Sequence, residues 1–187
     1  MLFKIIYIDP PWSYNRKAGQ GVIKDYNSMA NEDIYKLPIS RLADDDCALI
    51  CWLTFPKIAE GVKAIQSWGF EIKTVFATWI KLNSKNMQPF FGVGSYTKSN
   101  CEFCLLATKG NMHKYVKTNS ISSVVMAPRE KHSKKPDVVR KMITDLFGEL
   151  PRVELFARQR HDGWTCLGDE LSGKDIRTEI EELICTK

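Results

Sequence analysis

Short apolar runs predict buried strands at several places along the chain. They cover residues 3–8, 47–54, 74–80, 102–108, 123–127 and 153–156. Each run has the length of a strand rather than of a helix, and most of them stop at a proline, a glycine or a polar cluster. The first run ends abruptly at Asp9, which is followed by two prolines.

Apolar residues at helical spacing predict three helices, over residues 56–68, 136–147 and 174–184. The positions that share a face are Ile58, Val62, Ile65 and Trp68 in the first, Val138, Met142, Ile143 and Leu146 in the second, and Ile176, Ile180 and Leu183 in the third. Gly69 and Gly148 are expected to end the first two. The polar stretches 13–30, 83–100 and 111–123 are predicted loops, and the last two are expected to be mobile without substrate.

Alternating strands and helices, with strands apolar along most of their length, predict an α/β protein with a mainly parallel sheet covered on both faces. No boundary divides the chain, so we expect a single domain over residues 1–187. Ligands of such sheets lie beyond the carboxyl ends of the strands. Asp9 follows the first strand, and Arg158 and His161 follow the strand at 153–156. We therefore expect these side chains to meet at one site.

The composition is that of an ordinary globular protein, with 44% hydrophobic and 26% charged residues. We expect no signal peptide, no membrane contact and a cytoplasmic location in a bacterial or phage-infected cell, because no apolar stretch approaches the length of a membrane span. The six cysteines are predicted to be reduced thiols. Cys101 and Cys104 form a lone pair, whereas a zinc site needs four ligands, so no metal is expected.

Positive charge is concentrated in the middle of the chain. Residues 81–141 hold 12 Lys/Arg and 3 Asp/Glu, whereas the remainder is net acidic. A concentrated positive field suits a polyanion such as DNA or RNA. The alternative is a solvated basic face that serves only solubility. Our hypothesis is that four lysines contact phosphates: Lys85, Lys98, Lys114 and Lys117.

The sequence Asp9-Pro10-Pro11-Trp12 carries the most specific chemistry. The exocyclic amine of adenine is a poor nucleophile, because its lone pair is delocalised into the ring. The Asp9 carboxylate and the Pro10 carbonyl can each accept a hydrogen bond from that amine, and the prolines, Pro11 included, keep the backbone rigid. Trp12 can stack on a base that has left its helix. The plainer alternative is a proline turn with Trp12 as a core aromatic.

Five blocks of sequence, in order, carry a resemblance to a known family. They are residues 8–12, residues 26–29, residues 100–110, residues 129–137, and residues 154–158 with 163–164 and 167–170. With these blocks the chain resembles the MT-A70 family of N6-adenine methyltransferases, over roughly residues 3–171. The resemblance implies a Rossmann-like fold and S-adenosylmethionine as the cofactor.

The resemblance also implies roles for individual residues. Lys135 would bind the methionine end of the cofactor. The other expected cofactor-binding residues are Asp9, Glu154, Arg158, His161, Asp169 and Glu170. Members of the family have amides where this chain has Asp169 and Glu170. Tyr14 and Tyr26 are expected beside Trp12 at the target base, and Glu102 matches a carboxylate near the active site.

We therefore expect an N6-adenine methyltransferase whose polymer is DNA, with RNA as the alternative. A non-catalytic nucleic-acid-binding subunit is a rival interpretation, which the intact Asp9–Trp12 motif disfavours. A small-molecule methyltransferase is another, which the basic middle segment disfavours. The apolar stripe of the last predicted helix either packs on its own sheet or meets a second subunit, so a homodimer stays open.

Overall fold

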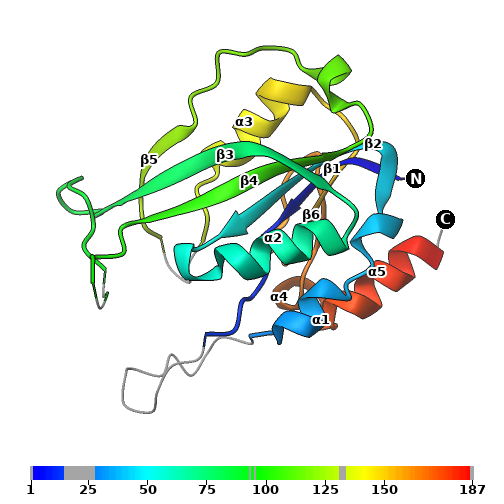
Figure 1. Cartoon of the computed structure of the whole chain (residues 1–187), viewed down its shortest axis with the longest axis horizontal. Coiled ribbons are helices and arrows are strands. Elements are labelled where there is room, and N and C mark those ends of the chain that lie inside the picture. Colours follow the sequence, from blue (N-terminus) through cyan, green and yellow to red (C-terminus); the bar gives the residue numbers. More distant parts are fainter. Residues whose placement is uncertain (1, 15–27, 93, 95, 131–133, 186–187) are drawn as a thin grey trace.

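A computed structural model describes residues 2–14, 28–92, 94, 96–130 and 134–185. These residues build one sheet with the strand order β5-β3-β4-β2-β1-β6-β7 (Figure 1). The strands are β1 (Phe3–Ile8), β2 (Ala43–Leu53), β3 (Glu71–Leu82), β4 (Cys101–Lys109), β5 (Val124–Pro128), β6 (Arg152–Leu155) and β7 (Thr165–Leu167). The helices are α1 (Asn31–Tyr35), α2 (Ile58–Ser67), α3 (Val138–Phe147), α4 (Asp169–Ser172) and α5 (Ile176–Cys185). Short 3-10 turns are η1 (Ile39–Arg41), η2 (Phe55–Lys57) and η3 (Met112–Tyr115).

The sheet is mainly parallel, as the apolar strands predicted. Strands β1, β2, β6 and β7 run in one direction, and β3 and β5 share it. Strand β4 alone runs the other way, between β2 and β3. Because of this reversal, the first residues of β4 lie at the edge of the sheet where the other strands end. The sequence did not reveal this reversal, because an apolar run has no direction.

Two apolar layers cover the two faces of the sheet. Alternate residues of β1 divide between them, since Ile6 and Ile8 face α1, α2 and α5, whereas Ile5 and Tyr7 face α3. Figure 1 shows α3 on one side of the sheet and the other three helices on the opposite side. The prediction that both faces of the sheet are covered by helices is therefore confirmed. The apolar stripe of α5 packs on its own chain, with Ile176 and Ile180 buried in the first layer, so this stripe gives no support to a homodimer.

Several element boundaries differ from the sequence predictions. Strands β2 and β3 begin earlier than predicted, because their first residues are polar and gave no apolar signal. The predicted loop 111–123 contains η3, whose Met112 is buried. In α3 the predicted positions Met142 and Ile143 are buried, whereas Val138 is exposed and Val139 takes its place in the core. The short elements α1, β7 and α4 were missed. No helix in the described parts of the chain is long and apolar enough to span a bilayer.

A close backbone approach fixes the segment after β6. The amide of Ala157 donates to the Leu167 carbonyl at 2.8 Å. A Cβ atom on Gly168 would collide with the backbone of Ala157, so only glycine permits this contact. The contact brings the start of α4 beside the residues that follow β6.

We predict that Gly168→Ala lowers the free energy of unfolding by about 1–3 kcal/mol, because the added methyl forces the two backbones apart. The control is Lys174→Ala in the same region, which removes only an exposed ion pair with Glu182 and should change stability by less than about 0.5 kcal/mol. Urea unfolding of both variants measures the difference. Equal stability of Gly168→Ala and the wild-type protein would show that the segment accommodates the methyl group.

Candidate active site

Asp9 lies immediately beyond the carboxyl end of β1, where the predicted site was expected. Its Oδ2 atom accepts a hydrogen bond from the Lys135 ammonium at 2.7 Å. The carboxylate is partly accessible, with 26% of the side chain exposed. Pro10 and Pro11 follow, and the Pro11 carbonyl accepts a bond from the Met29 amide at 2.9 Å. The backbone after Asp9 is thus fixed by the two proline rings and by the hydrogen bond between the Met29 amide and the Pro11 carbonyl.

Four charged side chains of alternating sign form a chain that ends at Asp9. Lys135 also contacts Glu102 Oε2 at 3.3 Å, and the other Glu102 oxygen accepts a bond from Lys81 at 2.5 Å. Glu102 reaches Lys135, the partner of Asp9, because β4 runs antiparallel to its neighbours and begins at this edge of the sheet. Its carboxylate is buried and engaged by two lysines, so the contact seen in the structure is with the site's own cations. A direct role of Glu102 in substrate binding stays a prediction.

The environment changes the proton affinity of both carboxyls. Burial raises the pKa of Asp9 above its usual range, and the Lys135 ammonium opposes that rise. Burial also acts to raise the pKa of Glu102, but the ammoniums of Lys135 and Lys81 outweigh it and hold this pKa below its usual range. Glu102 therefore stays charged and helps to keep Lys135 charged beside Asp9.

Trp12 does not have the position expected of a base-stacking residue. Only 4% of it is exposed, and it belongs to the apolar layer that also holds Ile8 and Ile34. Its indole N–H donates to the Trp52 carbonyl at 3.3 Å, and its amide donates to the Pro10 carbonyl at 2.9 Å. The ring therefore anchors the Asp9-Pro10-Pro11 turn to the core, and the expectation of base stacking by Trp12 is corrected.

A cavity opens beside Asp9 at the carboxyl ends of β1 and β6. Five expected cofactor residues line it: Asp9, Lys135, Glu154, Arg158 and Glu170. Five lining residues were not expected, namely Tyr7, Lys134, Arg140, Phe156 and Gln159. Arg140 follows the Lys-Pro-Asp block by one helical turn, which is the signal that could have identified it. Tyr7 is buried on the same face as Arg140, whose guanidinium lies 5.4 Å from the Tyr7 ring centroid.

Glu154 is held by Arg140. The guanidinium of Arg140 donates to both carboxylate oxygens, at 2.7 and 2.6 Å, in a bidentate pair. Burial acts to lower the pKa of Arg140, but the neighbouring Glu154 carboxylate outweighs it and raises this pKa, so Arg140 is charged. Glu154 is thereby fixed as a buried acceptor on the wall of the cavity.

Phe156 turns the chain at the end of β6. Its φ of 60° is unusual for a residue with a side chain, and such strain persists only where the surroundings hold it. Beyond this turn, Arg158 Nε lies 3.4 Å from a Glu170 oxygen. The turn and the Gly168 contact therefore bring one cation and one anion to the cavity from separate segments.

Two expected cofactor residues lie outside the cavity lining. The His161 ring lies 3.4 Å from the Gln159 amide, and burial lowers the pKa of His161. Asp169 begins α4 and accepts a bond from the Glu170 amide with its own side chain. Both are neighbours of lining residues, so their part in cofactor binding stays a prediction.

Aromatic groups are exposed at the rim near Asp9. The Tyr14 hydroxyl lies 2.5 Å from the Thr54 hydroxyl, and burial raises the pKa of Tyr14. The neighbouring Phe55, in η2, is exposed, and its ring centroid lies 5.0 Å from that of Phe103. Sequence reasoning had not selected Phe55. Tyr26 lies outside the described residues.

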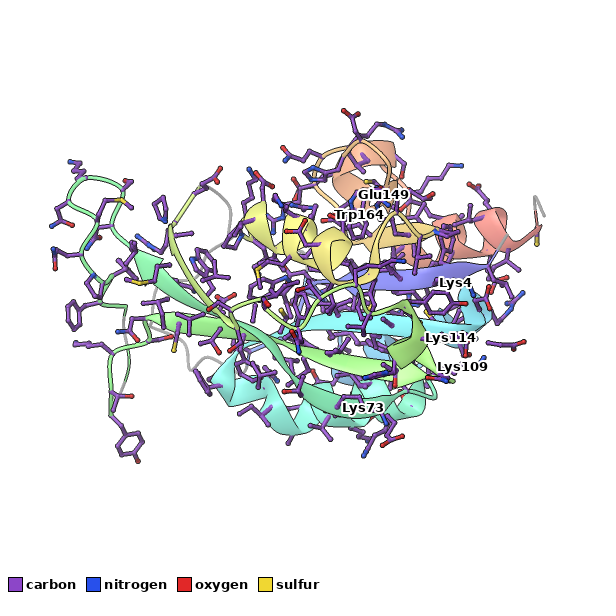
Figure 2. The ribbon with its side chains drawn as sticks, turned by 90° about the horizontal axis from the view of Figure 1, so that it is seen from above. Lys4, Lys73, Lys109, Lys114, Glu149 and Trp164 are labelled. Atoms are coloured by element: carbon purple, nitrogen blue, oxygen red, sulfur yellow. The ribbon has the colours of Figure 1, made fainter. Side chains whose placement is uncertain are left out.

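The four lysines proposed to bind phosphates divide between opposite ends of the sheet. Lys85 and Lys98 lie between β3 and β4, at the end that holds Asp9. Figure 2 labels Lys114 at the other end, near Lys4 and Lys109 and far from the loop that joins β3 to β4. There Lys114 pairs with Asp46 at 2.5 Å, and the Lys117 amide donates to Leu146 at the end of α3. The four lysines therefore do not form one surface.

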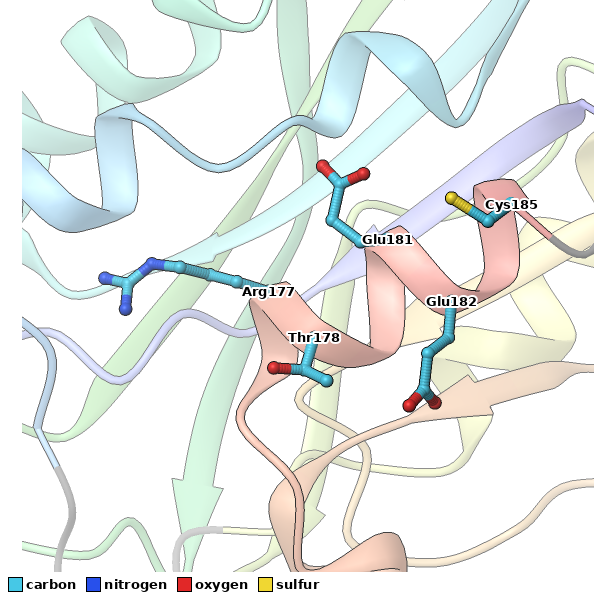
Figure 3. Close-up of a pocket in the computed structure, with 5 residues that line it drawn as sticks. All are labelled: Arg177, Thr178, Glu181, Glu182 and Cys185. Carbon is cyan, nitrogen blue, oxygen red and sulfur yellow. The ribbon is translucent and has the colours of Figure 1, made fainter.

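A second pocket lies on the outer side of α5 (Figure 3). All its lining residues come from this one helix: Arg177, Thr178, Glu181, Glu182 and Cys185. Glu181 pairs with Arg41 and Glu182 with Lys174, so neighbouring side chains already balance its acidic groups. This pocket contributes nothing to the site at Asp9.

Comparisons with known proteins agree with this geometry. The profile of the MT-A70 family matches residues 3–170. The type II methyltransferase M.MunI of a Mycoplasma species is 32% identical, over 96% of this chain and 84% of its own length. An N(6)-adenosine-methyltransferase MT-A70-like protein of Arabidopsis thaliana is 28% identical over 95% of this chain, and the human N(6)-adenine-specific methyltransferase METTL4 is 26% identical over 90%. The chain spans 25% of the plant protein and 37% of the human one. With its Asp9 motif at a strand end and a match across most of its length, the chain belongs to the MT-A70 family of N6-adenine methyltransferases.

Proposed function

We propose that the protein transfers a methyl group from S-adenosylmethionine to the N6 amine of adenine in DNA. One observation carries this proposal. The Asp9 carboxylate is fixed by Lys135 beside two proline carbonyls, at the mouth of a cavity whose walls carry both signs of charge. Two hydrogen-bond acceptors for an amine, the Asp9 carboxylate and the Pro10 carbonyl, therefore lie next to a cavity that suits a charged cofactor.

The residues of the cavity fit this cofactor. Its carboxylate needs cations, which Lys134, Lys135 and Arg158 supply. Its ribose hydroxyls need acceptors, which the carboxylates of Glu154 and Glu170 supply. Phe156 offers an apolar surface within the same lining. When bound, S-adenosylmethionine supplies a methyl group that is activated by its sulfonium centre.

The chain's own groups prepare the amine. Asp9 accepts a hydrogen bond from one N6–H, and the Pro10 carbonyl accepts from the other with the lone pair that the Trp12 amide leaves available. Both bonds draw electron density to the nitrogen and turn its lone pair towards the cavity. The surplus proton leaves the amine after transfer, so no strong base is required, and positioning supplies most of the rate.

DNA is favoured as the polymer because a bacterial type II methyltransferase matches over most of both chains. RNA is the second candidate, because plant and fungal relatives are named as adenosine or RNA methyltransferases. A role as a non-catalytic nucleic-acid-binding subunit is disfavoured by the Asp9 carboxylate, which is positioned at the cavity.

We predict that Asp9→Ala abolishes methyl transfer while leaving the fold intact, because the carboxylate serves chemistry beyond the strand rather than packing within it. The measurement is transfer of labelled methyl to DNA and RNA in parallel, followed by nucleoside analysis. Asp46→Ala is the control, since that carboxylate pairs with a lysine at the opposite end of the sheet. Wild-type activity in purified Asp9→Ala would contradict the mechanism. Methylation of RNA alone by the unaltered protein would contradict the choice of DNA.

We predict that Lys135→Ala weakens binding of S-adenosylhomocysteine, which keeps the cofactor's carboxylate, by about 10- to 150-fold. It should also move the acid limb of the pH–activity profile. The ionised carboxylate of Asp9 is the active form, and removing the neighbouring ammonium raises the pKa of Asp9 further, so activity should be lost at a higher pH than in the wild-type protein.

Calorimetric titration and the pH profile measure these two effects separately. The control for the profile is Lys114→Ala, because Lys114 pairs with Asp46 at the opposite end of the sheet rather than with Asp9. An acid limb that stays in place in Lys135→Ala would remove Lys135 from the control of Asp9.

We predict that the lysines near Asp9, and not those at the opposite end, carry phosphate contacts. Each lysine that neutralises a phosphate adds about 0.7–0.9 to the slope of log affinity against log salt. The double variant Lys85→Ala/Lys98→Ala should therefore flatten the slope for DNA by about 1.4–1.8. The matched double variant Lys114→Ala/Lys117→Ala removes the same charge and should leave the slope unchanged. The reverse pattern would place the polymer at the opposite end of the sheet.

A further inference from the structure

The segment between β3 and β4 is anchored directly to the charged chain at Asp9. The Phe90 amide donates to the Lys81 carbonyl at 2.7 Å, and the Lys81 amide donates to Asn100 at 2.9 Å. The Lys81 ammonium holds Glu102, which in turn holds Lys135. Figure 1 shows this segment projecting beyond the sheet at the end where β3 and β4 meet. We name its described residues, 83–92, 94 and 96–100, the arm.

Backbone contacts give the arm a defined shape. Asn83 and Gln88 pair through their backbones at 2.9 Å, and Met87 at this turn has a φ of 56°. Farther along, the Gly92 amide donates to the Ser99 carbonyl at 3.1 Å. A Cβ atom on Gly92 would collide with that carbonyl, so glycine is what allows the two backbones to approach. The predicted loop is therefore held together by backbone hydrogen bonds, and its mobility without substrate stays a prediction.

The arm presents large apolar side chains to solvent. Phe91 is 69% exposed and Tyr96 is 102% exposed, and Met87 is also exposed. In contrast, Phe90 is covered by the Arg129 guanidinium, which lies 3.3 Å from its ring centroid. Lys85 and Lys98 are exposed on the same arm. Exposed aromatics flanked by cations are a combination that binds unpaired bases, because rings stack on bases while lysines contact phosphates.

We propose that the arm binds DNA in which bases are unpaired, with Phe91 and Tyr96 stacking on nucleotides beside the target adenine. The proposal rests on the proposed function, which requires the adenine to leave a duplex before its amine can reach Asp9. Stacking on exposed bases offsets part of the cost of that opening. A protein partner would be met by apolar contacts alone, whereas the lysines on the arm and the connection to Asp9 favour a polyanion that also enters the site.

The test is a fluorescence-anisotropy titration with one labelled DNA sequence in three forms: single-stranded, fully paired, and paired except for one unpaired adenine. Phe91→Ala/Tyr96→Ala should weaken binding of the two forms with unpaired bases by about 5- to 150-fold, and should change binding of the full duplex less. The salt slope should stay unchanged, because no charge is removed.

Phe91→Trp/Tyr96→Trp is the matched variant, since it keeps two rings and should retain wild-type affinity. Wild-type affinity of the double-alanine variant for single-stranded DNA would overturn the proposal. Equal weakening on all three forms would do the same, because it would exclude a preference for unpaired bases. Labelled-methyl transfer by the unaltered protein is measured alongside. Absence of transfer to any DNA form refutes the proposed function, whereas the binding series alone decides the role of the arm.

Discussion

The ion pair between Lys135 and Asp9 is the interaction on which the site depends. It joins the segment before α3 to the end of β1, two parts of the chain that are far apart in sequence. Buried charges are costly unless they are paired, and here Glu102 and Lys81 continue the pairing. The alternation of sign places the Lys135 ammonium between two carboxylates. Asp9 thereby stays in a fixed position at the cavity even though burial alone would favour its protonated form.

The same constraint explains why the fold places one reversed strand beside the motif. A parallel β4 would carry Glu102 to the opposite edge of the sheet, leaving Lys135 with only one of its two carboxylates. In the observed direction, Glu102 pairs across the sheet with Trp79 and faces the site edge, and the turn into β4 carries the arm to the same edge. The position of the Asp9 carboxylate, its supporting charges and the exposed aromatics are thus consequences of one topology.

Trp12 and Arg140 show how packing assigns roles that residue type leaves open. Trp12 is aromatic and next to the motif, but its ring fills the layer under α1 and its N–H bonds to Trp52. It supports the position of Asp9 from below, whereas Tyr14 and Phe55 are exposed aromatics at the rim among the described residues. Arg140 is one helical turn into α3, where its fork fits both oxygens of Glu154. The positive segment is likewise divided, because Lys114 pairs with Asp46 at the far end of the sheet.

The sequence by itself determined the class of fold and the strand ending at Asp9, because apolar periodicity is a local property of the chain. It fixed β1 at Phe3–Ile8 and placed Asp9 beyond its end. The lysine and carboxylates expected at the cofactor came from the resemblance of ordered sequence blocks to a known family. Tertiary structure decided the direction of β4, the burial of Trp12, the pairing of Glu154 with Arg140, and the separation of Lys85 and Lys98 from Lys114 and Lys117. These features depend on which segments become neighbours across the sheet. Neighbours of that kind are set by the packing of the whole chain and leave no periodic signal in any one segment.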